Sequence, residues 1–235
     1  MSFGDRARGD PVARRTEYDA GQAAKRLKVP ATAFRWARHT GLSPPRTASS
    51  CQWSRAAVEA LDAEALRATM PSPPISGSAA ADRIAEALGT PNPTVYGEKA
   101  NVTAFVVRRF VDRGLLVDLS ATPDGTLHHP DQVTEVCQRQ DLADLVAADT
   151  PLGPEQAAAR LSVRRADFDH VIRLGWVRSP QSIKVRFGTS RTGAVDVALY
   201  TTASVDAVVP AHPEIDWEQL RAVEKGQRSP LAALR

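Results

Sequence analysis

The sequence predicts a mainly α-helical protein with small β-hairpins, arranged as three tandem repeats of one fold. A valine is followed twelve residues later by a helix-ending glycine three times, at Val29/Gly41, Val102/Gly114 and Val163/Gly175. Each repeat closes with an aromatic residue or histidine, a valine five residues on and an apolar residue three further, at Trp53–Val58–Leu61, His128–Val133–Val136 and Tyr200–Val205–Val208. Residues 22–29 (QAAKRLKV) also nearly match 156–163 (QAAARLSV). This shared spacing indicates one supersecondary unit used three times.

Composition favours several small cores in a reducing compartment. The chain has 235 residues, of which 43% are hydrophobic and 6% aromatic, with 17 prolines. Cys51 and Cys137 lie in separate repeats, which argues against a disulfide framework and a zinc site. The polar start of the chain predicts neither a signal peptide nor a membrane span. We therefore expect a cytoplasmic protein without a membrane partner.

The charge is distributed unevenly along the chain. The formal net charge is only +3, but residues 18–61 carry seven Lys and Arg against two acids. Residues 78–139 carry six against eight, and residues 150–209 carry eight against five. Two basic repeats thus flank an acidic one, and local positive fields favour a polyanionic partner.

Both ends of the chain lack the repeat. Residues 1–17 form a basic arm without apolar periodicity, which we expect to be disordered. The C-terminal tail, residues 210–235, offers one short helix near 216–223, and we expect it to fray beyond that point.

The first repeat spans residues 18–70. Asp19 is a good N-cap for a short amphipathic helix. Pro30 cannot continue that helix but can begin the next one, which ends at Gly41. Ser54 caps a third helix, and a Pro- and Ser-rich linker follows.

The second repeat, residues 78–147, has an extra leading helix over 79–88. We expect a short helix over 95–100, then the helix that ends at Gly114. An alternative pairs the leading helix directly with the segment that follows it. The spacing downstream of Val102 favours the first arrangement.

Hairpins are predicted in the second and third repeats. In the second, extended runs at 115–119 and 127–128 flank a Pro-Asp-Gly turn. In the third repeat, residues 150–209, apolar residues alternate with Lys184 and Arg186 before a Gly-bracketed tip, and the alternation resumes behind it.

The order of helix, tight turn, glycine-ended helix, two-stranded wing and closing helix resembles the winged helix-turn-helix of the MerR and excisionase families. Residues 22–29, Phe34-Arg35-Trp36 and Gly41-Leu42 carry the resemblance. In these families the second helix lies in the DNA major groove, and the wing touches the backbone or the minor groove. The resemblance implies three tandem winged helix-turn-helix domains that bind double-stranded DNA.

The cationic residues of the predicted helices and wing are the candidate DNA contacts. A short helix with arginine on its solvent face can enter the major groove, and cations near the turn can meet phosphates. Trp36 is more readily explained as a partly packed side chain, and Asp169 departs from the pattern set by Arg35 and Arg108. The candidates are Lys25, Arg26, Lys28, Arg35, Trp36, Arg38, Arg108, Arg109, Arg164, Arg165, Lys184, Arg186 and Arg191.

The motifs favour a binding protein over an enzyme. We find no phosphate-binding glycine loop, no metal-spaced His or Cys set and no activated nucleophile, so we expect no catalytic residue, metal or cofactor. A transcriptional regulator and an accessory factor of recombination, plasmid replication or partition fit equally, with a homo-oligomer or a recruited protein as possible partners. The alternative is a protein–protein interaction adaptor that uses the same fold without DNA, which Asp169 and the acidic middle repeat favour.

Overall fold

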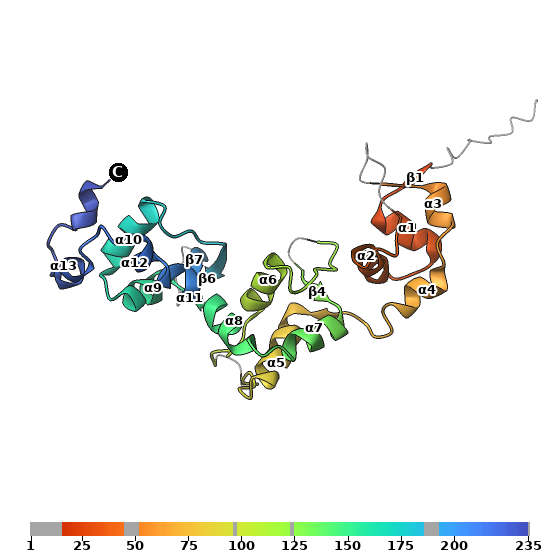
Figure 1. Cartoon of the computed structure of the whole chain (residues 1–235), viewed down its shortest axis with the longest axis horizontal. Helices are drawn as coiled ribbons and strands as arrows, with labels where there is room; N and C mark the ends of the chain where they lie inside the picture. Colours follow the sequence, from red (N-terminus) through yellow and green to blue (C-terminus); the bar gives the residue numbers. More distant parts are fainter. Residues whose placement is uncertain (1–15, 45–51, 96–97, 123–124, 186–192, 235) are drawn as a thin grey trace, which may run out of the picture. The chain divides into compact units, whose positions relative to one another are not determined.

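The computed structural model describes residues 16–44, 52–95, 98–122, 125–185 and 193–234. They form short helices and small antiparallel sheets, as predicted for a mainly α-helical chain (Figure 1). No helix in these ranges is both long and apolar enough to cross a membrane. Backbone contacts divide the chain into two compact units: unit one is residues 1–76 with 117–130, and unit two is residues 77–116 with 131–235.

Within the described ranges, three stretches follow one order: a two-residue strand, two helices, a strand or hairpin, and closing helices. The first repeat comprises β1 (Glu17–Tyr18), α1 (Ala20–Leu27), α2 (Ala31–His39), β2 (Trp53–Ser54), α3 (Arg55–Glu59) and α4 (Ala63–Ala68). The second comprises β3 (Ile75–Ser76), α5 (Gly77–Ala87), α6 (Ala104–Asp112), β4 (Leu127–His128), α7 (Pro130–Cys137) and α8 (Leu142–Asp149). The third comprises β5 (Pro151–Leu152), α9 (Pro154–Leu161), α10 (Arg165–Arg173), β6 (Gln181–Val185), β7 (Val195–Thr201), α11 (Thr202–Asp206) and α12 (Val208–Ala211), followed by α13 (Trp217–Ala222) and the 3-10 helix η1 (Pro230–Ala233).

A short strand opens each repeat and pairs antiparallel with the strand before the closing helices. The partners are Tyr18 with Trp53, Ile75 with His128, and Leu152 with Tyr200. The second member of each pair is the aromatic residue or histidine of the repeated pattern. This position of the repeated pattern therefore marks a strand pairing that the sequence alone did not predict.

The repeated glycines adopt the left-handed conformation. Their φ angles are 77° at Gly41, 73° at Gly114 and 75° at Gly175. An added Cβ would meet no atom within 4 Å at any of them, so the conformation, not crowding, favours glycine. Each ends the second helix of its repeat, as predicted.

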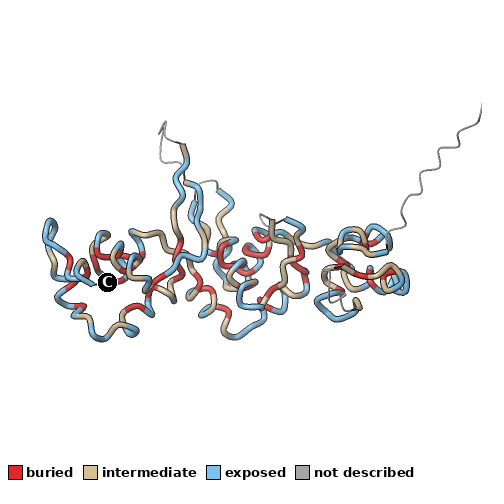
Figure 2. The backbone as a smooth tube through the Cα atoms, turned by 90° about the horizontal axis from the view of Figure 1, so that it is seen from above, coloured by how far each residue is buried: buried red, intermediate tan, exposed pale blue. Residues whose placement is uncertain are grey.

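The first and third repeats share one core arrangement. Phe34 meets Trp53 edge to face with ring centroids 5.2 Å apart, and Phe168 meets Tyr200 in the same way at 5.2 Å. Each pair joins the second helix to the strand before the closing helices. Figure 2 shows the buried residues in red along the helices. The core of the first repeat also contains Ala23, Ala24, Val29, Ala37, Val58 and Leu66.

The helix predicted over 95–100 is absent from the described part of that segment. Helix α5 instead contacts α6 directly, as in the alternative arrangement. Two asparagines fold the connection into a loop. Asn92 donates to the Val102 carbonyl and accepts from its N–H, both at 2.9 Å, and Asn101 donates to the Thr90 and Pro91 carbonyls.

The hairpin predicted in the second repeat is wrong. Strand β4 pairs with β3 and not with residues 115–119. Leu119 makes one backbone bond to the Leu127 carbonyl, at 2.7 Å, and Asp118 Oδ1 accepts from the N–H groups of Ser120 and Leu127. The carboxylate of Asp118 takes bonds that a strand ladder would otherwise use.

The C-terminal tail does not fray as predicted. Asp216 caps α13, in the place expected, but the chain then returns to the core of the third repeat through η1. Trp217, Leu220 and Leu231 are all buried in that core. At the other end, residues 1–15 of the predicted arm lie outside the described residues, while Glu17 belongs to β1.

Candidate nucleic-acid interface

The turn between the first two helices has the same geometry in the first and third repeats. A capping box joins Asp19 and Gln22 at the start of α1, and Gly153 and Gln156 form the matching backbone contact at α9. Both helices end in a left-handed residue, Lys28 with φ 54° and its counterpart Ser162 with φ 59°. The similar sequences therefore fold into similar two-helix motifs.

The first motif presents Lys25 and Lys28 to solvent. Both are exposed, and neither ammonium group has a hydrogen-bond or ion-pair partner among the described residues. Arg26 differs, because it donates to Glu59 at 2.6 Å and 3.0 Å. The bonds from Arg26 and Arg55 lower the pKa of the Glu59 carboxyl below its ordinary value. Lys25 and Lys28 are thus the cations of this turn that remain available.

Helix α2 meets residues 117–122 and 125–130, hereafter the cover segment, within unit one. Arg35 donates from Nη1 to the Leu119 carbonyl at 2.7 Å. The Trp36 ring stacks on the His129 ring, with centroids 4.4 Å apart. Arg38 is exposed near the end of the helix. Two of the three candidates on this helix therefore hold another part of the chain.

The second repeat commits Arg109 to a charge network in unit two. Arg109 donates to Asp112 at 2.6 Å and lies 3.7 Å from Asp149, a fully buried carboxylate. Arg113, which the sequence reasoning missed, donates to the same carboxylate at 2.9 Å. Arg108 is exposed on α6. The network fastens α6 to α8, and Arg108 is the more exposed of the two candidates.

Arg164 joins helix α10 to the C-terminal segment. Its guanidinium donates to both carboxylate oxygens of Asp167, at 2.7 Å and 2.9 Å, and to the carbonyls of Glu224 and Gln227. Arg165 is paired with Asp169 on its own helix. Arg164, a candidate DNA contact, therefore makes four donor bonds within the protein.

Arg173 completes the attachment of the C-terminal segment, and the sequence reasoning missed it. It donates to the carbonyls of Leu231 and Leu234, both at 3.0 Å.

The i,i+3 and i,i+4 spacings of Arg164 with Asp167 and of Arg165 with Asp169 were a visible signal that these arginines pair locally.

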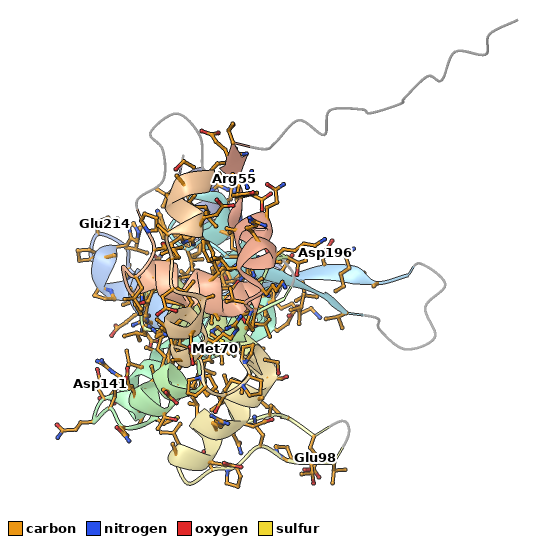
Figure 3. All side chains as sticks on the ribbon, turned by 90° about the vertical axis from the view of Figure 1, so that its right-hand side faces the viewer. Arg55, Met70, Glu98, Asp141, Asp196 and Glu214 are labelled. Carbon is orange, nitrogen blue, oxygen red and sulfur yellow. The ribbon has the colours of Figure 1, made fainter. Side chains whose placement is uncertain are left out.

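The predicted hairpin of the third repeat is present. Strands β6 and β7 pair over five positions, with Lys184 opposite Asp196. Figure 3 labels Asp196 on this hairpin, which projects from its helices. Lys184 is exposed, and Ile183 and Val195 are 41% and 50% exposed. Arg186 and Arg191 lie outside the described residues.

Comparisons with protein-family models, curated proteins and solved structures find no match. The resemblance to MerR and excisionase proteins therefore depends on the quoted residues alone. No group of three His, Cys, Asp or Glu side chains in the described ranges could hold a metal ion. The thiol of Cys137 bonds to the Arg83 carbonyl, and burial raises its pKa.

Proposed function

We propose that the chain is a sequence-specific double-stranded DNA-binding protein built from three tandem winged helix-turn-helix modules. The threefold order of strand, two helices, left-handed glycine, strand and closing helices is the observation that carries the proposal. The close match of the two-helix motifs in the first and third repeats supports it further. A transcriptional regulator and an accessory factor of recombination, plasmid replication or partition would share these contacts.

The proposed contact set is narrower than the sequence alone suggested. It keeps the exposed Lys25, Lys28 and Arg38 of the first repeat, Arg108 of the second and Lys184 of the third. Such cations hold phosphates and set the register on the duplex, while base edges supply specificity. Arg35 and Trp36 belong to the proposed DNA contacts only if the cover segment dissociates from helix α2.

Salt-dependent binding to a duplex tests the proposal. Fluorescence anisotropy with a labelled random duplex should show affinity falling steeply with salt, because each neutralised phosphate contributes about 0.9 to the log–log slope. Lys25→Gln with Lys28→Gln should reduce the slope by roughly 1.8. Lys225→Gln, at an exposed lysine of the C-terminal segment, is the matched control and should leave the slope unchanged.

A protein-interaction adaptor is the second candidate function. Arg35, Trp36 and Arg164 support it, because each holds a segment of the chain where a groove-reading helix would need free side chains. No retention on duplex DNA at low salt would favour the adaptor and overturn the proposal. Arg35→Ala is a poor probe of either function, since it also removes the bond to Leu119.

A further inference from the structure

Three of the five histidines of the chain gather in unit one, where the cover segment meets helix α2. His129 is 3% exposed, stacks on Trp36 and shares a hydrogen bond with the Thr69 carbonyl at 2.9 Å. His39 lies with its ring centroid 5.2 Å from that of Trp36. Imidazoles titrate near neutral pH, so a cluster of them at one contact can make that contact pH-sensitive.

Among these histidines, His128 is the one whose neutral ring would be protonated only at a cost in free energy. It is fully buried, and its Nδ1 lies 3.0 Å from the Val117 carbonyl. A carbonyl oxygen only accepts, so Nδ1 carries the proton of the neutral ring. Nε2 is buried without a hydrogen-bond partner among the described residues. Protonation would place both a charge and an unpaired N–H in the interior.

The residues at the equivalent positions make His128 distinctive. The strand pairing aligns it with Trp53 and Tyr200, which complete the aromatic pairs of the other two repeats. Burial lowers the pKa of His128, against weaker opposing effects from the Val117 carbonyl and Asp118. The buried ring therefore stays neutral at a pH where a released ring takes up a proton.

We propose that residues 117–122 and 125–130 form an acid-released cover of helix α2, in which protonation of His128 frees Arg35 and Trp36 from the cover segment. The His128–Val117 bond joins the two ends of the cover segment to each other, and Arg35 and His129 bind the segment to α2 and to the Thr69 carbonyl. The release is a property of the protein alone. That the freed side chains then meet DNA rests on the proposed function.

Asp118 is a charged group that favours protonation of His128, and its effect is weaker than that of burial. Asp118 Oδ1 already accepts from two backbone N–H groups of the same segment. Arg35 is cationic and lies on the α2 side of the contact, where it donates to the Leu119 carbonyl. Protonation of His128 therefore adds positive charge to a segment that already contacts the Arg35 cation, which favours separation.

Hydrogen exchange of the full-length protein, followed by mass spectrometry, tests the release without DNA. A histidine that binds its proton only in the released state has there the ordinary pKa near 6.5. Lowering the pH from 7.5 to 5.5 should then raise the equilibrium constant for release of the cover segment about tenfold. Peptides from the cover segment should show this gain after correction for the intrinsic exchange rate. Equal protection at the two pH values would overturn the proposal.

His128→Tyr installs the residue type of the third repeat and should remove the pH dependence of exchange. His170→Gln, which changes a partly exposed histidine in unit two, is the control and should keep it. A persistent pH response in a folded His128→Tyr protein would assign the effect to other groups and refute the role of His128. Should that variant fail to fold, NMR titration of the His128 ring in the natural protein decides. A transition at or above pH 6.5 would contradict the proposal.

Discussion

The Asp167→Asn substitution measures how firmly the C-terminal segment is held on helix α10. The Asp167 side chain is fully buried and accepts two hydrogen bonds from Arg164. Asparagine keeps the size but loses the charge and turns an N–H₂ group toward these donors. Removing one partner of a buried ion pair costs about 3–5 kcal/mol. Because 25% of the Arg164 side chain is exposed and asparagine keeps one acceptor, we expect a loss of roughly 2–3 kcal/mol.

The pH dependence of this loss gives an independent check. Burial alone would raise the pKa of Asp167, but hydrogen bonds from Arg164 and Ser229 outweigh it and leave the pKa below the ordinary 3.8. A carboxyl whose pKa is lowered by folding stabilises the fold above its unfolded pKa and loses that contribution as pH falls through the folded value. The difference between the natural protein and Asp167→Asn should therefore shrink below pH 3.8.

Urea unfolding followed by circular dichroism, with hydrogen exchange of residues 224–234, provides the assay. Asp169→Asn is the control, because Asp169 is also paired on α10 but is 57% exposed, and its loss should cost less than about 0.5 kcal/mol. Equal effects of the two substitutions at neutral pH would refute the argument. So would an Asp167→Asn deficit that persists unchanged in acid.

Two stability predictions concern the repeated elements, and unfolding in urea checks both. Gly175→Ala should destabilise the third repeat by about 1–2 kcal/mol, because alanine must adopt the left-handed conformation there. Gly21→Ala, within helix α1, should stabilise the first repeat by about 0.5–1 kcal/mol. A stabilising Gly175→Ala together with a destabilising Gly21→Ala would contradict the backbone argument. Phe168→Ala should cost about 3–5 kcal/mol, because it empties a fully buried site against Tyr200, and a cost below about 1 kcal/mol would mean that this core is not tightly packed.

Local features of the fold could be predicted from the sequence. The N-caps Asp19 and Ser54 accept hydrogen bonds from N–H groups three residues further along the chain. Gly41 adopts the left-handed conformation at its own position. Such signals are visible in a short window. The strands β1, β3 and β5 are not, because two residues carry no alternation and their partners lie far along the chain.

The partners of the candidate side chains could not be predicted, for the same reason. The sequence marks cations near a turn, but only the fold decides which of them bind other segments. The carbonyls that hold Arg164 come from residues 224 and 227, and the carbonyl that holds Arg35 comes from Leu119. Leu231 follows the run 224–230 (EKGQRSP), which has no apolar periodicity, so its burial could not be predicted from the sequence pattern.

The position of Lys184 also affects how the protein behaves when concentrated. Strand β6 is an edge strand of its sheet, and the apolar side chains Ile183 and Val195 are exposed on the same hairpin. An exposed edge strand of this kind can pair with the edge strand of another molecule. A lysine on the strand opposes this pairing, because the lysines of the two molecules repel each other. Replacing Lys184 with an uncharged residue would therefore lower solubility, and Lys184→Arg, which keeps a positive charge opposite Asp196, is the safer variant for work at high concentration.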